Sequence, residues 1–363
     1  MALSPEERAA WVGLHLTPGI GPGRFARLVQ HFGSARAAWQ APIRELQAAG
    51  LPENVVEALT QTRKRVHPEK LLEQWAKQGI RVVLQEDPEY PPRLRHIPQA
   101  PPVLYVKGQW LPEDDWAVAV VGTRKATAYG RRVAEDVAQF LARHRVTVVS
   151  GLARGIDGVA HRAALDAGGR TLAVLAHGPD RIYPPEHRRL ARRIVERGAL
   201  ISDYPPGTRP EAPHFPARNR LISGLSLAVV VVEAGERSGA LITAAFAADQ
   251  GREVFAVPGP IYAAQSQGTL RLIQQGAHLL RTPEDLAQAL NLSLLPQQQE
   301  ARRRLPQEPL ERLLWEHLQE PTHIDDLCER TGLSSPQVSA LLTLMELKGL
   351  VRQVASMTYV AVG

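Results

Sequence analysis

The chain has 363 residues, 44% of them hydrophobic and 22% charged, and this length favours two or three globular domains. No stretch approaches the ~18 consecutive apolar residues of a transmembrane helix, which excludes a helical membrane protein. The single cysteine, Cys328, excludes an intramolecular disulfide and a cysteine-rich zinc site. The first residues lack the basic-then-apolar order of a signal peptide, so we expect a cytoplasmic protein.

The formal net charge is +6, and 37 of the 43 basic side chains are arginines. A guanidinium group suits bidentate binding of phosphate, but a GC-rich genome also enriches arginine, so composition leaves both explanations open. The net charge is +4 over residues 1–109, +4 over 110–290 and −2 over 291–363. The excess of basic residues therefore lies before residue 291, and we expect any acidic partner to bind to that part of the chain.

Residues 1–108 are expected to form a helical N-terminal domain, because short amphipathic segments alternate with Pro-Gly, Gly-Ser and Gly-Leu-Pro breaks. Residues 16–28 contain Gly19-Ile20-Gly21 and are typical of a helix-hairpin-helix of the SAM-like kind. Backbone amides in such a hairpin can hold one phosphate, although a hairpin used only for packing fits the sequence equally well. The proline-rich residues 87–102 are expected to be an extended connector.

Residues 109–290 have the pattern of an α/β domain. Near-continuous apolar runs alternate with helical stretches, which is typical of a parallel sheet covered by helices on both faces. The predicted strands are Ala117–Val121, Val146–Val149, Thr171–Leu175, Leu227–Val232 and Glu253–Val257.

Small-residue turns follow three of these strands and precede helices. The turns contain Gly122, Thr123 and Arg124, then Ser150, Gly151 and Arg154, and finally Ser238 and Gly239. Glycine lets an anion approach the backbone, and the amides of a helix N-terminus point at it. Such turns meet at the carboxyl edge of a doubly wound sheet, where ligands bind. Each could also be a plain strand-to-helix turn, and Asp157 a plain helix cap.

Residues 213–224 combine an aromatic ring, Phe215, with Arg218, Asn219 and Arg220. A base can stack on the ring while arginines bind phosphates, which suits a single-stranded nucleic acid of any sequence. A helix start with Phe215 as a hydrophobic staple explains the same residues, and the sequence does not decide between the two.

Residues 291–304 are expected to be a linker, and residues 305–363 a winged helix with three helices followed by two β-prone runs. A helix that reads DNA needs polar or basic side chains and basic flanks. The third predicted helix has its only base, Lys348, at its end, and residues 305–363 carry a net charge of −4. We therefore predict that this domain contacts protein rather than DNA, and that Cys328 is an apolar filler.

Seven sequence pieces follow one another in a fixed order across residues 116–281. They are Gly122-Thr123-Arg124, Tyr129-Gly130, residues 150–157, Ile182-Tyr183-Pro184, residues 215–220, residues 238–243 and Val257-Pro258-Gly259. Together they resemble the DNA-processing protein A family (DprA/Smf), and the helical front and small C-terminal domain suit its longer members.

The resemblance implies an extended Rossmann-like domain over residues 109–290, with neither catalytic activity nor a cofactor or metal. It implies a homodimer that binds and protects single-stranded DNA without sequence specificity and helps to load the RecA recombinase during natural transformation. It carries Arg124 and the segment Phe215–Arg220 over as DNA-binding positions.

Two enzyme classes are the alternatives. A nucleotide phosphoribohydrolase of the lysine-decarboxylase-like group has a similar sheet, but it uses a glutamate shortly after its glycine-rich turn. Residues 240–246 contain no carboxylate, and Glu233 and Glu236 precede the turn instead. An NAD-dependent oxidoreductase would need the dinucleotide fingerprint, which is missing. We therefore favour a binding protein.

Overall fold

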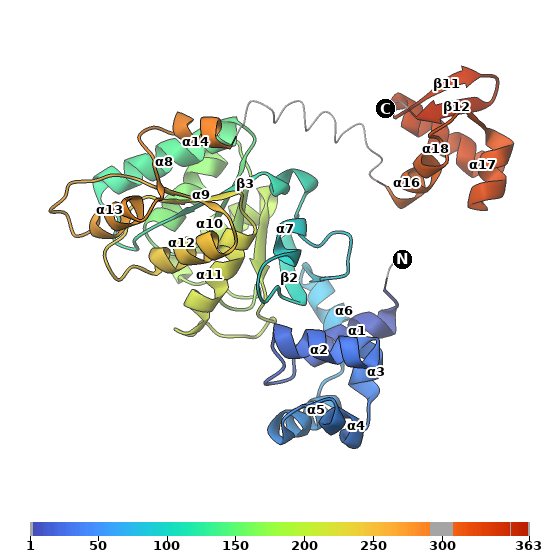
Figure 1. The fold of residues 1–363 in the computed structure, drawn as a ribbon, viewed down its shortest axis with the longest axis horizontal. Helices are drawn as coiled ribbons and strands as arrows, with labels where there is room; N and C mark the ends of the chain where they lie inside the picture. The colour runs from blue at the N-terminus through green and yellow to red at the C-terminus, as the bar shows by residue number, and fades with distance from the viewer. Residues whose placement is uncertain (1–2, 291–307, 349, 362–363) are drawn as a thin grey trace. The chain divides into compact units, whose positions relative to one another are not determined.

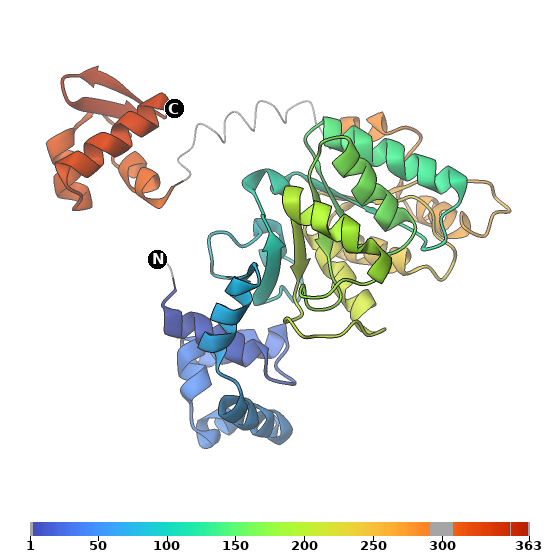
Figure 2. The same ribbon diagram turned by 180° about the vertical axis from the view of Figure 1, so that it is seen from behind.

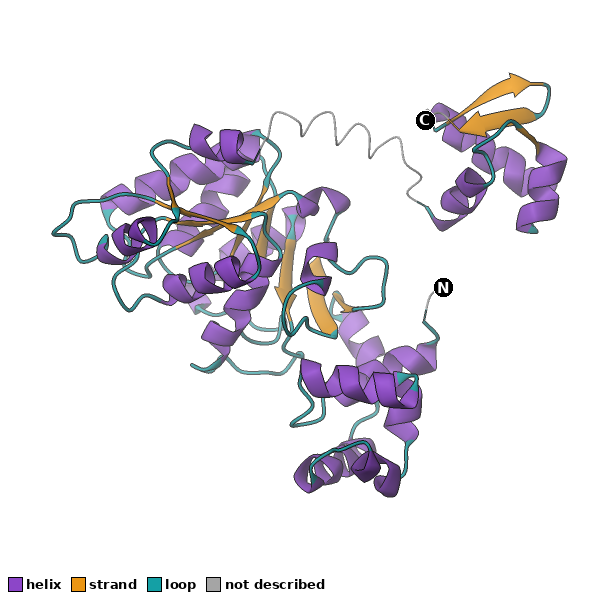
Figure 3. Cartoon of the chain, viewed as in Figure 1, coloured by secondary structure: helices purple, strands orange, loops and turns teal. Residues whose placement is uncertain are grey.

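The computed structural model describes residues 3–290, 308–348 and 350–361 (Figures 1 and 3). The chain divides into two compact units, residues 1–286 and 287–363. None of the helices in these described ranges has both the length and the hydrophobicity that crossing a membrane requires.

Six helices open the first unit. They are α1 (Pro5–His15), α2 (Pro22–Phe32), α3 (Ala35–Gln40), α4 (Ile43–Ala48), α5 (Glu53–Arg65) and α6 (Pro68–Lys77). Gly19, in the turn between α1 and α2, has a φ of +85°, a conformation that favours glycine. Trp11 and Phe25 pack together on either side of this turn, with ring centroids 4.7 Å apart. The expected pair of helices joined by a glycine hairpin is therefore present.

A nine-stranded sheet forms the centre of this unit, in the order β1-β2-β6-β5-β4-β3-β7-β8-β9. The strands are β1 (Ile80–Leu84), β2 (Val103–Gly108), β3 (Ala117–Val121), β4 (Thr147–Ser150), β5 (Thr171–Val174), β6 (Ala199–Ser202), β7 (Ala228–Val231), β8 (Glu253–Ala256) and β9 (His278–Leu279). All neighbours from β6 to β9 in this order are parallel, which confirms the predicted parallel sheet. The hairpin of β1 and β2 extends it through antiparallel pairing of β2 with β6.

This β1–β2 hairpin differs from the expectation of a helical domain that ends in an extended connector at residues 87–102. The segment between its strands also contains a short helix, α7 (Pro92–Arg95). Successive side chains of a strand point to opposite faces, so the hairpin contributes side chains to two hydrophobic cores. Val83, Leu104 and Val106 pack in the core of the sheet, whereas Ile80, Leu84, Val103 and Tyr105 pack with the N-terminal helices. The helical domain and the sheet therefore share these two strands.

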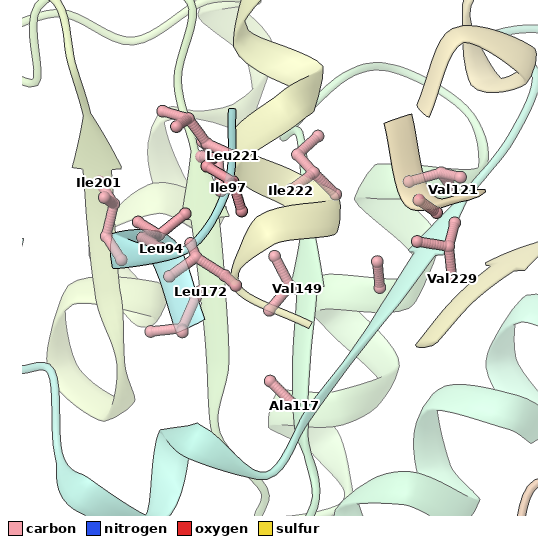
Figure 4. Packing of buried hydrophobic residues seen from close by; sticks show 14 of the residues in the cluster. Leu94, Ile97, Ala117, Val121, Val149, Leu172, Ile201, Leu221, Ile222 and Val229 are labelled. Atoms are coloured by element: carbon pink, nitrogen blue, oxygen red, sulfur yellow. The ribbon is translucent and has the colours of Figure 1, made fainter. Parts of the chain in front are cut away.

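Helices cover both faces of the sheet (Figures 1 and 2). One face carries α8 (Ala128–Arg143), α9 (Ile156–Asp166) and α10 (Arg188–Arg197), and the other carries α11 (His214–Gly224) and α12 (Gly239–Asp249). Two further helices follow, α13 (Gln267–Gln274) and α14 (Glu284–Ala289). Leu221 and Ile222 of α11 pack with Leu94 and Ile97 over the buried strands, which fixes α11 on the sheet (Figure 4).

The second unit has the three helices and two wing strands that the sequence predicts for a winged helix, and one further short strand between the first two helices. It contains α16 (Pro309–Glu316), β10 (Thr322–His323), α17 (Ile324–Thr331), α18 (Ser335–Leu347), β11 (Val351–Ala355) and β12 (Thr358–Ala361). Cys328 is half-buried against its core. Lys348, just after α18, donates a hydrogen bond of 2.5 Å to the buried carboxylate of Glu311.

Candidate nucleic-acid interface

An open pocket of about 740 Å³ lies where β3 and β7 end at the carboxyl edge of the sheet. It is lined by the turn after β3, the first half of α11 and the N-terminus of α12. The polar and aromatic residues of its lining are Thr123, Arg124, Asp157, Tyr183, Phe215, Arg218, Asn219, Arg237, Ser238 and Thr243. The position is the one at which open α/β sheets bind ligands.

The turn after β3 is held by its neighbours on both sides. The amide of Thr123 donates to the carbonyl of Glu233 at 2.7 Å, and its carbonyl accepts from the amide of Ile156 at 3.2 Å. A side chain at Gly122 would collide with Ile156, and one at Gly155 would collide with the backbone of Thr123. These glycines let three strand ends approach one another, so the turn presents Arg124 in a fixed place.

Arg124 and Phe215 meet at this pocket from different elements. The guanidinium carbon of Arg124 lies 5.4 Å from the centre of the Phe215 ring, within the range of a cation–π contact. Arg124 is exposed and Phe215 is half-buried. The ring of Tyr183 lies 5.8 Å from that of Phe215, centroid to centroid, and extends the aromatic surface. A flat group could stack here beside a cation that faces water.

Arg218 also lines the pocket, but its guanidinium group is bonded to the protein. Only 3% of the residue is exposed, and it donates to the carbonyls of Gly151, at 3.1 Å, and Val174. Burial lowers the pKa of Arg218 to about 10, with the nearby Asp157 carboxylate acting in the opposite direction. Arg218 is therefore charged at neutral pH, and it ties α11 to the ends of β4 and β5.

Arg220 lies away from this pocket. It pairs with Asp203 at 2.8 Å and lines a second pocket of about 650 Å³, bordered by His15 of α1. Positions two apart on a helix point about 200° from each other, which separates Arg220 from Arg218. The structure therefore places the two arginines in different pockets, whereas both were predicted to bind phosphates in one site.

The turn after β4 contributes less to the lining than expected. Ser150 is buried and donates to the Val120 carbonyl at 2.7 Å, and Gly151 is bonded to Asp157. Arg154 is exposed and pairs with Glu186. None of these three predicted residues lines the pocket: Ser150 and Gly151 support it through these hydrogen bonds, and Arg154 lies outside it.

The N-terminus of α12 opens into the pocket as predicted. Ser238 is its N-cap, with its Oγ accepting from the Ala240 amide at 3.3 Å, and Gly239 faces open space. The Asn219 side chain donates to the Gly239 carbonyl at 3.2 Å and so links α11 to α12. Tyr183 and Arg237 also line the pocket but were not among the predicted site residues. Tyr183 belongs to the Ile182-Tyr183-Pro184 motif, and Arg237 directly precedes Ser238.

Two carboxylates at or near the pocket, those of Asp157 and Glu233, are held by hydrogen bonds within the protein. Among the described residues that line it, Asp157 alone has a carboxylate, and this group accepts from the amides of Gly151 and Ala153. Burial raises the pKa of Asp157, although Arg218 counteracts this shift. Glu233 accepts from the amide of Thr127 at 3.0 Å and from its hydroxyl group. This arrangement does not favour the phosphoribohydrolase, which needs a carboxylate directed at its substrate.

Three family models match separate parts of the chain. The family described as DNA recombination-mediator protein A matches residues 81–291, the DprA-like N-terminal HHH domain matches residues 5–58, and the DprA winged helix domain matches residues 298–356. The chain is 36% identical to Protein Smf of Synechocystis, over 98% of this chain and 99% of that protein. It is 40% identical to Protein Smf of Escherichia coli, over 86% and 87%.

Two solved structures resemble the chain in fold and sequence. DNA processing protein A of Streptococcus pneumoniae matches with a TM-score of 0.68 and 33% identity, over 79% of this chain and 98% of that one. DNA processing protein A of Helicobacter pylori, described for its single-stranded DNA binding mode, matches with a TM-score of 0.53 and 28% identity, over 58% and 95%.

Proposed function

The chain belongs to the DNA recombination-mediator protein A family, and we propose that it binds single-stranded DNA in the pocket at the carboxyl edge of its sheet. The observation that carries the proposal is the exposed Arg124 beside the Phe215 ring. A base stacks on Phe215 while a neighbouring phosphate contacts Arg124. The open N-terminus of α12, at Ser238 and Gly239, receives a second phosphate.

Binding is independent of base sequence in this proposal. Stacking and phosphate contacts are available to every nucleotide, because every base has a π-face and every linkage a charge. Arg218 acts as a positioning residue, since its guanidinium group holds α11 and thereby Phe215 in place. Arg220, paired with Asp203, supports α11 from its other side.

The protein also protects the strand and helps to load the RecA recombinase onto it, in the cytoplasm and during natural transformation. The family description as a recombination mediator supports this role. A homodimer through the sheet domain is part of the proposal. The short edge strand β9 supports it, because Leu279 is 44% exposed there and β8 is the one strand that pairs with β9 among the described residues.

A binding assay in solution tests the proposal. Anisotropy of labelled single and double strands, measured across a salt series, should show tighter binding of single strands and similar affinities for different base sequences. Arg124→Ala should weaken binding and flatten the salt slope by ~0.7, the value for one lost phosphate contact. Arg143→Ala, which removes an exposed charge from the end of α8, is the matched control. Unchanged affinity and slope in Arg124→Ala would refute the assignment of the pocket.

A further inference from the structure

The outer surface of α10 is strongly basic. Five of its ten residues are arginines, and all five are exposed: Arg188, Arg189, Arg192, Arg193 and Arg197. Its one acidic residue is Glu196. Leu190, Ala191 and Ile194 form the buried side, so the arginines share the half of the helix that faces water.

Most of this charge is not neutralised by the residues that the structure describes. Arg193 pairs with Asp166 of α9 at 2.6 Å. Across the described ranges 3–290, 308–348 and 350–361, the structure shows no ion pair for the other four arginines of α10. Arginines spaced four apart on a helix repel one another, as Arg188 and Arg192 do. The fold itself gains nothing from this repulsion, which points to an anionic partner.

A short, well-anchored segment connects this surface with the pocket. Tyr183 lines the pocket, and Arg188 follows it by five residues. A fully extended chain of five residues spans about 18 Å, so the Cα atoms of Tyr183 and Arg188 are at most that far apart. Between them, the His187 ring is buried with its Nδ1 2.9 Å from the Leu152 carbonyl oxygen, and Glu186 pairs with Arg154. From Arg188 to Arg197 the helix then extends a further ~14 Å. Pocket and helix thus hold fixed positions within one unit.

We propose that a single strand bound in the pocket leaves it beside Tyr183 and follows the outer surface of α10, where the arginines bind its phosphates. Figure 2 shows α10 on the face of the sheet that also carries α8 and α9. The inference rests on the proposed function and extends its binding site to a second segment. A planar guanidinium group matches the oxygens of a phosphate, which favours a nucleic-acid backbone over an acidic protein surface.

The test removes four charges from α10 and leaves the pocket intact. The variant is Arg188→Gln, Arg189→Gln, Arg192→Gln and Arg197→Gln together, and Arg193 is kept because it pairs with Asp166. The control, Lys64→Gln, Arg65→Gln, Arg143→Gln and Arg145→Gln together, removes four exposed charges elsewhere. Both full-length variants are titrated with single strands of ~6 and ~20 nucleotides, lengths within and beyond the reach of one stacking site.

We expect the α10 variant to bind the short strand as the wild type does and the long strand more weakly. Each lost phosphate contact lowers the salt slope by ~0.7 and weakens binding about fivefold near ~0.1 M salt. Two to four lost contacts therefore weaken long-strand binding by roughly 25-fold to several hundredfold, and the control stays close to the wild type.

Several results would overturn the inference. One is an unchanged affinity for the long strand, another an equal loss on both lengths, and a third an equal loss in the control. A loss confined to duplex DNA would assign α10 to a different ligand. If the wild type binds neither strand, the proposed function itself is wrong. If the wild type binds the short strand in a manner that depends on Arg124, but the α10 variant behaves like the wild type, only the inference about α10 is wrong.

Discussion

Replacing Arg218 with alanine tests whether this arginine holds the site together or contacts DNA. Its guanidinium group is buried, donates to two backbone carbonyls and lies beside the Asp157 carboxylate. Its removal leaves a buried charge without its partner, which costs about 3–5 kcal/mol of unfolding free energy. At ~2 °C per kcal/mol for a unit of this size, Tm should fall by about 6–10 °C.

The pH dependence of this loss identifies its cause. Burial already raises the pKa of Asp157, and removal of Arg218 raises it further. A carboxyl group whose folded pKa lies above its unfolded value stabilises the fold at low pH, and this stability is lost as the pH rises through the folded pKa. The deficit of Arg218→Ala relative to wild type should therefore shrink as the pH falls toward 3.8, the ordinary value.

Thermal unfolding followed by circular dichroism at several pH values measures both effects, with the exposed Arg124→Ala as the comparison. The unfolding free energy of that variant should stay within ~0.5 kcal/mol of the wild-type value, as is usual for surface substitutions, so its Tm should hardly change. Its affinity for DNA should fall. If Arg218→Ala unfolds at the wild-type temperature and loses as much affinity as Arg124→Ala, the positioning role is wrong.

Three further predictions concern separate parts of the chain. Phe215→Ala should weaken binding of every homopolymer strand by about 1–3 kcal/mol, whereas Phe215→Trp should retain it; anisotropy measures this, and a loss restricted to one base would contradict simple stacking. Burial lowers the pKa of His161 from its ordinary value of 6.5 to about 3. The folding stability linked to the neutral ring is therefore complete above pH 6.5 and is lost as the pH falls from 6.5 toward 3. His161→Gln should flatten the acid side of the stability curve by up to ~1.4 kcal/mol per pH unit, and an unchanged curve in urea titrations would speak against it. Residues 305–363 expressed alone should not bind double- or single-stranded DNA at low salt, because α18 has no basic residue and Lys348 is paired with Glu311. Micromolar binding to either form of DNA would contradict the prediction that this domain contacts protein.

The parallel sheet could be predicted because its strands are short apolar runs between helices. The ends of β3, β4, β5, β7 and β8 lie within one residue of the predicted ranges. The strand β6 was missed because only Gly198 separates it from α10, so the sequence shows no clear break between the helix and the strand. The pair β1 and β2 was missed because the prolines between them were interpreted as the mark of a connector, although they enclose a hairpin with a helix inside it.

The centre of the candidate site could be predicted from motifs, but the direction of individual side chains could not. Glycines and small residues at strand ends place Arg124 and Ser238 at one edge by topology alone. For Arg218 and Arg220, the decisive information is where α11 begins, since a helix separates positions two apart onto different sides. The partner of each arginine, a carbonyl or a distant carboxylate, is fixed only by tertiary packing.

The two-faced β1–β2 hairpin has a consequence for synthesis on the ribosome. β2 ends at Gly108, but its sheet partner β6 begins at Ala199, so about 5 to 20 seconds of translation separate them at ~5–20 residues per second. Throughout that interval one face of the hairpin can pack on the N-terminal helices, while Leu104 and Val106 on the other face have no core to enter. The growing chain therefore exposes an apolar, unpaired strand edge until the middle of the protein has emerged, and this edge is where a chaperone or premature self-association would act.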